Sequence, residues 1–141
     1  MRTKNKKSGF TLVELMIVAA IIAILAAIII PLMGSNLDRA VAAEGQNLLG
    51  TAATAAKAYY AEHDAFPANF TAVNVGSVTA GELARGKYFN APTMATATSL
   101  SDWKVQATMK VTKGGLTSGD ALTLDQSGAW AGAVATAVKL N

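Results

Sequence analysis

Hydrophobic residues follow different patterns along this chain, and the first is an unbroken run. Residues 15–33 read LMIVAAIIAILAAIIIPLM, without a charged or polar side chain. A helix of this length spans about 28 Å, close to the bilayer hydrocarbon thickness of about 30 Å. The run therefore predicts a membrane-spanning helix, with a kink near residues 27–31 because Pro31 lacks a backbone N–H donor.

Residues 34–64 predict an amphipathic continuation of that helix. Apolar residues recur at spacings near 3.6, with polar residues mostly on other faces; the apolar stripe comprises Leu37, Val41, Leu48, Ala52, Ala56 and Tyr59. Gly45 and Gly50 are each expected to weaken the helix by about 1 kcal/mol relative to alanine. Residues 64–67 end it, so we expect one long kinked helix over about residues 10–63.

Strict alternation replaces the helical pattern near the C-terminus. Residues 103–112 alternate apolar and polar side chains, which predicts a half-buried strand; the apolar face comprises Trp103, Val105, Ala107, Met109 and Val111. Lys113-Gly114-Gly115 and residues 125–128 indicate turns. Further strands are expected over residues 121–125 and 129–140, and short turns between strands favour an antiparallel meander; the last strand would have Trp130, Val134, Val138 and Leu140 on one face.

The predicted fold class is α+β, with the long N-terminal helix packed on a small antiparallel sheet of three to four strands. Five segments are expected: a basic leader (1–9), the apolar helix (10–33), its amphipathic continuation (34–64), an irregular connection (65–102) and the sheet (103–141). Within the connection, residues 80–85 predict one helical turn, and three residues are expected to anchor it to the core: Tyr88, Phe89 and Pro92.

The positive charge of the chain is concentrated in its leader. The formal net charge is +3, from 12 Lys and Arg against 9 Asp and Glu. Four of the basic residues lie in the leader, so residues 10–141 carry 12 − 4 = 8 basic against 9 acidic residues, a net charge of −1. The basic balance is therefore no argument for a nucleic-acid partner. Cations ahead of the apolar run predict a cytoplasmic N-terminus.

Three interpretations fit the N-terminal edge of the apolar run. The first is a plain membrane anchor. The second is a secretory signal peptide, but the run is too long for one and the A-x-A sequence at residues 40–42 is too distant from it. The third is a segment cleaved at Gly9–Phe10, which would keep the hydrophobic helix. Glu14 lies against the apolar run, and an ionisable residue beside lipid is a candidate for function.

The sequence KSGFTLVELMIVAAIIAILAAIIIP, residues 7–31, closely resembles the N-terminus of bacterial type IV prepilins and of type II secretion pseudopilins. The resemblance, over about residues 7–39, implies that a prepilin peptidase cleaves after Gly9 and that Phe10 is N-methylated. It also marks Glu14 as an assembly residue and Pro31 as a family feature. Ala23 departs from the family, because many members have glycine there.

This resemblance implies a structural subunit that polymerises through its hydrophobic helix. The expected partners are copies of itself, the inner membrane before assembly, the prepilin peptidase/methyltransferase and an assembly platform. The expected locations are a single-pass inner-membrane form and then an extracellular pilus or periplasmic filament.

Glu14 has a physical role under this interpretation. After cleavage, the amine of Phe10 lies about one helical turn from Glu14, and a neighbouring helix at a small axial offset brings its own amine to the carboxylate. Leaving one partner of a buried ion pair without the other costs several kcal/mol. The pair would therefore specify the register between subunits.

The remaining candidate residues point to no cofactor, metal site or enzymatic activity. The chain has no cysteine, which excludes a disulfide and a thiolate zinc site. His63 is expected as a surface residue at the helix end. Asp120 and Asp125 are too few for a calcium site. A set of lysines is interpreted as a solvated strand face: Lys104, Lys110 and Lys113.

Alternatives to a pilus subunit remain open from the sequence. A type II secretion pseudopilin or a minor or competence pilin would carry the same N-terminus. A more remote alternative is a membrane-anchored or secreted binding domain that does not polymerise, and the sequence offers no motif for a membrane-tethered enzyme.

Overall fold

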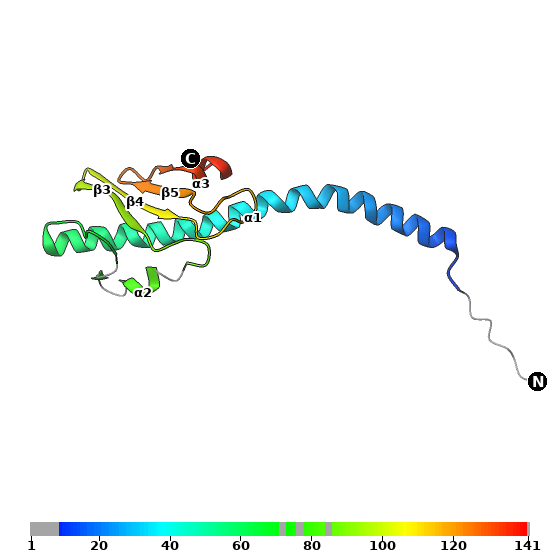
Figure 1. The fold of residues 1–141 in the computed structure, drawn as a ribbon, viewed down its shortest axis with the longest axis horizontal. Helices are drawn as coiled ribbons and strands as arrows, with labels where there is room; N and C mark the ends of the chain where they lie inside the picture. The colour runs from blue at the N-terminus through cyan, green and yellow to red at the C-terminus, as the bar shows by residue number, and fades with distance from the viewer. Residues whose placement is uncertain (1–8, 71–72, 76–77, 84–85, 141) are drawn as a thin grey trace, which may run out of the picture. The chain divides into compact units, whose positions relative to one another are not determined.

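The computed structural model describes residues 9–70, 73–75, 78–83 and 86–140 (Figure 1). The chain divides into two units, with the boundary between Met33 and Gly34. A single helix, α1 (Leu12–His63), contributes to both units and supplies the whole of the regular structure described in the first. The expected helix over residues 10–63 is confirmed, and it begins two residues later than predicted.

The described part of the second unit combines the rest of α1 with short strands and two short helices. After α1 come β1 (Asn74–Val75), β2 (Val78–Thr79) and α2 (Ala80–Leu83), and then the main sheet: β3 (Thr93–Ser99), β4 (Asp102–Thr108), β5 (Ala121–Asp125) and β6 (Trp130–Ala131), with α3 (Ala133–Val138) at the end. β1 and β2 form a separate antiparallel pair. The main sheet has the order β3-β4-β5-β6, and every neighbouring pair is antiparallel. The predicted fold class is thus confirmed.

The sheet differs from its predicted extent in two places. The strand expected over residues 103–112 ends at Thr108, and Met109 adds only an isolated bridge to Phe89. Val111, expected on the apolar face, is 46% exposed. The prediction of an irregular connection over residues 65–102 is wrong at its C-terminal end, which forms β3. β3 reads TMATATS, and its small or polar side chains give two faces of similar polarity and hence little periodic signal.

The last predicted strand, over residues 129–140, is also wrong. Only Trp130 and Ala131 are in the sheet; Gly132 follows at φ 98°, and the chain then turns into α3. A spacing of four residues between Val134 and Val138 fits one face of a strand and one face of a helix equally well. Alanine favours the helix over the strand, and α3 has three alanines in six residues.

The hydrophobic core lies between α1 and the sheet, entirely within the second unit. Buried residues of α1 recur at helical spacing, and they meet buried residues of β4, β5 and α3. Gly45 shows how close the approach is, because a Cβ there would lie 2.7 Å from Phe89 Cζ and 2.9 Å from Leu122 Cδ2. The sequence marks Gly45 only as a weak point of the helix, whereas the structure shows that its lack of a side chain makes room for the core.

The predicted anchors of the connection are confirmed. Phe89 and Pro92 are buried, and Tyr88 is half-buried against the core. The expected helical turn is present as α2 over Ala80–Leu83; the end of the predicted range, residues 84–85, lies outside the described residues.

Candidate functional site

The N-terminal edge of α1 presents the two residues of the predicted cleavage site. Gly9 and Phe10 precede the helix, and Phe10 is 86% exposed. A Cβ placed on Gly9 would meet nothing within 4 Å. A protease needs the backbone around its target bond to be non-helical and accessible, and the Gly9–Phe10 bond meets both conditions. The leader residues 1–8 lie outside the described residues.

Glu14 and Thr11 cap the first turn of α1. The Glu14 Oε2 atom accepts hydrogen bonds from the backbone N–H and the hydroxyl of Thr11, both at 2.9 Å. In return, Thr11 Oγ1 accepts the Glu14 N–H at 3.3 Å. This is a capping box, which satisfies backbone donors that a helix N-terminus otherwise leaves without partners. The sequence interpretation missed it, although Thr-x-x-Glu before an apolar run is a readable signal.

The capping box gives Glu14 a partner within its own chain. The predicted pairing between Glu14 and a free Phe10 amine needs cleavage and a second copy, and it stays a prediction. Both functions use the same carboxylate, but Oε1 is not the atom that contacts Thr11. The two roles of Glu14 are therefore geometrically compatible.

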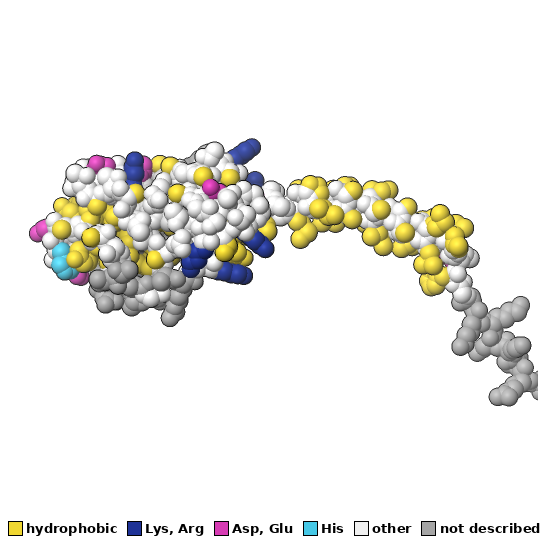
Figure 2. All heavy atoms as spheres, in the orientation of Figure 1, with side chains coloured by type: hydrophobic (Ala, Val, Ile, Leu, Met, Phe, Trp, Pro, Cys, Tyr) yellow, Lys and Arg dark blue, Asp and Glu magenta, His cyan; other side chains and the backbone are white. Residues whose placement is uncertain are grey.

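The apolar part of α1 is exposed on all of its faces. Every residue from Leu12 to Met33 except Ala26 is exposed, and the window most suited to a bilayer has none of its residues buried. By length and composition alone, α1 can cross a membrane. Figure 2 shows the resulting hydrophobic surface. A helix that is apolar all round needs partners all round, either lipid or other protein.

Pro31 lies inside α1, and the helix is continuous on both sides of it. A proline at this position leaves the carbonyl of Ala27 without its usual helical donor. Whether the helix kinks there, as predicted, stays a prediction.

Comparison with known proteins identifies the family. The family model of the prokaryotic N-terminal methylation motif matches residues 4–30, which include Gly9, Phe10 and Glu14. A type IV major pilin of Neisseria gonorrhoeae is 40% identical over 88 residues, 62% of this chain and 51% of that protein. The fimbrial protein EcpC of Eikenella corrodens is 37% identical over 109 residues, 77% of this chain and 67% of EcpC. The chain belongs to the type IV pilin family.

A shorter match to another pilin has a higher identity. The type IV major fimbrial protein FimA of Dichelobacter nodosus is 56% identical over 45 residues, 32% of this chain and 28% of FimA. The chain spans about two thirds of the length of EcpC and about half that of the N. gonorrhoeae pilin. Pilins are structural proteins and not enzymes.

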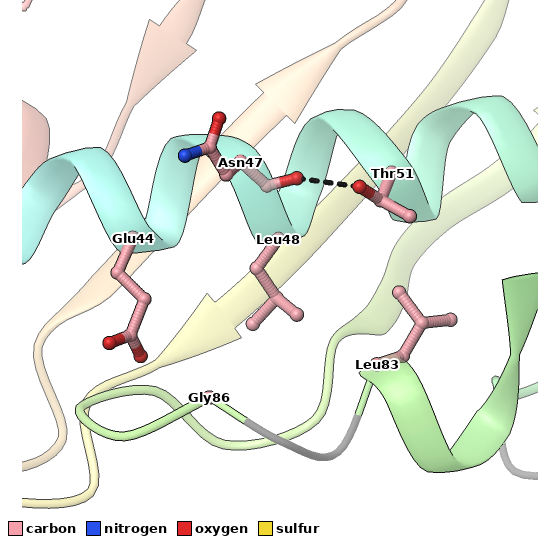
Figure 3. Close-up of a pocket in the computed structure, with 6 residues that line it drawn as sticks. All are labelled: Glu44, Asn47, Leu48, Thr51, Leu83 and Gly86. Carbon is pink, nitrogen blue, oxygen red and sulfur yellow. Dashed lines mark hydrogen bonds between the residues drawn. The ribbon is translucent and has the colours of Figure 1, made fainter.

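A second feature of this pilin is a hollow beside α1 in which Glu44 holds the connection to the sheet (Figure 3). The hollow, of about 350 Å³, is lined by Glu44, Asn47, Leu48, Thr51, Leu83 and Gly86. Glu44 Oε1 accepts the backbone N–H groups of Tyr88 at 2.8 Å and Phe89 at 3.4 Å. Glu44 is half-buried, and its carboxylate replaces water for two donors at the edge of the core. The sequence gives no sign of this contact, because Tyr88 and Phe89 follow Glu44 by 44 and 45 positions along the chain.

The other candidate residues of this pilin serve local structure. The His63 ring stacks on Tyr59 with centroids 4.1 Å apart, and its Nδ1 lies 3.1 Å from the Tyr59 carbonyl oxygen. Asp120 accepts the Thr117 N–H at 2.8 Å, within its own loop. Among the residues that the structure describes, no three His, Asp or Glu side chains are placed to share a metal ion.

Asp125 closes the turn between β5 and β6. Its Oδ1 accepts the hydroxyl and backbone N–H of Ser127 and the N–H of Ala129, the last at 3.0 Å. The Ser127 hydroxyl, followed by the Ala129 N–H, lowers the pKa of the Asp125 carboxyl below its ordinary value, because both donors favour the charged form. This aspartate stabilises a turn through hydrogen bonds to Ser127 and Ala129.

Proposed function

We propose that the chain is the structural subunit of a type IV pilus, and that its copies assemble through residues 10–33. The observation that carries this proposal is the contrast along α1. Its C-terminal part is buried by its own sheet, whereas Leu12–Met33 is exposed on all faces. Lipid can cover such a surface first and other copies later, and the many alanines in it permit close helix approach.

Maturation follows from the N-terminal edge in this proposal. A prepilin peptidase cleaves after Gly9, and methylation modifies the new amine of Phe10. The family match and the accessible bond support this step. The methylated amine keeps its positive charge, so it can still pair with a carboxylate.

Glu14 sets the register between subunits in this proposal. The Phe10 amine of one copy pairs with Glu14 of its neighbour in a water-poor filament core. Leaving either charge buried and unpaired costs about 3–5 kcal/mol, so displaced subunits are disfavoured. The orientation follows from the leader: its cations hold the N-terminus in the cytoplasm, and residues 34–141 lie outside the cytoplasm.

Glu14→Gln separates the ion pair from the capping box. Glutamine also caps a helix from this position, but it has no charge to pair with the Phe10 amine. We expect Glu14→Gln to enter the membrane normally and to lower the yield of sheared filaments at least about tenfold, since an unpaired buried amine costs several kcal/mol. Glu62→Gln is the control, because it neutralises an exposed glutamate at the other end of α1.

Two measurements decide the outcome. Mass spectrometry of the exported protein should show a chain that begins at methylated Phe10, and electron microscopy should show surface filaments that disappear when the gene is deleted. Normal filament yield from Glu14→Gln would refute the ion pair. An exported chain with residues 1–9 intact, or lacking residues 10–33, would refute the pilus subunit. Filaments confined to the periplasm would instead indicate a pseudopilin.

A further inference from the structure

Basic side chains gather at one end of the second unit, the end that contains its first residues. Figure 2 shows most of the visible Lys and Arg side chains of this unit toward that end and most of the visible Asp and Glu side chains toward the opposite end. Arg39, on α1, and Lys139, directly after α3, line the same hollow of about 210 Å³, together with Ser35, Asp38, Ala137 and Val138. Arg39 and Lys139 are both exposed. Two cations that come from distant parts of the sequence thus face one recess of a size suited to a phosphate group.

A third cation, Lys113, precedes a turn that contacts α1 at the same end. The turn after Lys113 lies on α1, where the Gly115 N–H donates to Asp38 Oδ1 at 3.0 Å. A Cβ on Gly114 would overlap that carboxylate, and Gly114 has a φ of +63°. Glycine at this turn therefore lets the loop approach α1, which brings Lys113, the preceding residue, to the same end of the unit. We call Arg39, Lys113 and Lys139 the basal cluster.

The charge of the basal cluster exceeds that of its neighbouring acid. The cluster has three cations and one neighbouring carboxylate, Asp38, so these four residues sum to +3 − 1 = +2. Asp38 already accepts the Gly115 N–H. The opposite end of the unit has acidic residues at the close of α1 and at the start of β4, namely Glu62, Asp64 and Asp102. The cations of the basal cluster therefore lie at the end that the chain reaches first, whereas Lys57 and Lys104 lie toward the acidic end.

This end is tethered to the hydrophobic helix by a short piece of chain. Arg39 follows Met33, the last residue of the apolar run, by six residues. Even a fully extended chain of that length spans at most about 22 Å, and the same residues in a helix span about 9 Å. Wherever the apolar run ends in a bilayer, Arg39 is thus held near the headgroups. Anionic lipid headgroups attract such cations with about 1 kcal/mol for each Lys or Arg at the surface.

We infer that the basal cluster binds the phosphate groups of anionic phospholipids in the leaflet where the apolar helix ends. The inference rests on the proposed membrane stage of the subunit and adds a second, electrostatic attachment to it. In the membrane form, Arg39 and Lys139 hold a headgroup phosphate in their shared hollow, while Lys113 contacts the neighbouring surface. A subunit that leaves the bilayer for a filament gives up these contacts, so anionic lipid retains it in the membrane.

Lysine footprinting in nanodiscs tests this inference on the full chain. One copy is reconstituted into each nanodisc of phosphatidylcholine, with or without about one third phosphatidylglycerol, and exposed briefly to acetic anhydride, which is uncharged. We expect acetylation of Lys139 and Lys113 to slow at least about threefold in the anionic discs, and high salt to reverse the change. Lys104, an exposed residue at the other end of the sheet, is the internal control and should change little.

Matched variants identify the cations responsible. Arg39→Gln combined with Lys139→Gln should abolish the slower acetylation of Lys113, whereas Lys57→Gln combined with Lys104→Gln removes the same charge elsewhere and should preserve it. Equal protection of Lys104 and Lys139, or no protection of either, would overturn the inference. So would protection in phosphatidylcholine discs on adding inorganic phosphate alone, which would indicate a free-phosphate site. Because each disc holds one copy, a negative result leaves filament assembly untouched, and failure of the chain to enter discs would count against the membrane stage itself.

Discussion

Gly45 and Gly50 provide a direct test of how tightly α1 packs on the sheet. They are five residues apart in the same helix, and each is replaced by alanine in turn. In an unpacked helix both substitutions would stabilise by about 1 kcal/mol, because alanine has the higher helix propensity. Any difference between the two variants therefore reports the contacts that the new methyl group makes.

The structure places those contacts at Gly45 only. A Cβ at Gly45 would lie 2.7 Å from Phe89 Cζ and 2.9 Å from Leu122 Cδ2, and both side chains are 0% exposed, so neither can move freely aside. Overpacking of this kind costs about 1–3 kcal/mol. After subtracting the propensity gain, Gly45→Ala should destabilise by up to about 2 kcal/mol. A Cβ at Gly50 meets nothing within 4 Å, so Gly50→Ala should stabilise by about 1 kcal/mol.

Denaturant unfolding of the full chain in detergent micelles measures the difference. Trp103 is 2% exposed and reports the loss of the core by its fluorescence. We expect a lower midpoint for Gly45→Ala, a higher one for Gly50→Ala and unchanged slopes. If both variants shift the unfolding free energy in the same direction and within about 0.5 kcal/mol of each other, the close approach of α1 to Phe89 is refuted.

Two further predictions concern single carboxylates of the sheet-bearing unit. Glu44→Ala should destabilise the fold by about 1–3 kcal/mol, because it leaves the N–H groups of Tyr88 and Phe89 without their acceptor. Glu44→Gln keeps an acceptor oxygen and should lose less stability. The same unfolding assay compares the two variants, and equal losses would contradict the assigned hydrogen bonds. Asp125→Ala should destabilise near neutral pH, because the Ser127 hydroxyl lowers the folded pKa of Asp125 below its ordinary value of 3.8. A carboxyl group whose pKa is lower in the folded chain stabilises the fold at pH values above its unfolded pKa, and this stabilisation is lost as the pH falls through its folded pKa. The difference in unfolding free energy between wild type and variant should therefore close below about pH 4. A difference that stays constant down to pH 2 would contradict this.

The elements with one dominant periodicity could be predicted from the sequence. The apolar run and the stripe from Val41 to Ala56 together predict α1. The alternation from Trp103 to Met109, whose apolar residues are buried, predicts β4. β5 follows from a short apolar run between turns. In these segments, local pattern and tertiary burial agree, and prediction succeeds.

Prediction failed where two periodicities fit one pattern or where none was strong. Val134 and Val138 are four residues apart, which suits either a strand face or a helix face, and only Gly132 and the alanines of α3 favour the helix. β3 is an edge strand of threonine and alanine with little burial on either face. Its pairing depends on β4 rather than on its own hydrophobic pattern.

The candidate functional residues also divide into those that the sequence reveals and those that it does not. Gly9, Phe10 and Glu14 follow from a contiguous motif, and the Thr11 cap was readable from the same few residues. Glu44 was not readable, because its partners are backbone N–H groups, which leave no trace in the identity of the side chains.

Under the proposed function, folding and assembly use separate parts of α1. The core draws its helix residues from Val41 onward, and no side chain between Leu12 and Met33 is buried. The C-terminal segment is held without a disulfide, because the chain has no cysteine, and α3 buries Val134, Ala135 and Val138. Substitutions in residues 10–33 should therefore change assembly without changing the unfolding midpoint of the second unit, and Gly45 or Glu44 variants should change that midpoint while leaving the apolar surface intact. A Glu14 variant that lost filaments and also lowered the midpoint would mean that the two parts of the helix are coupled.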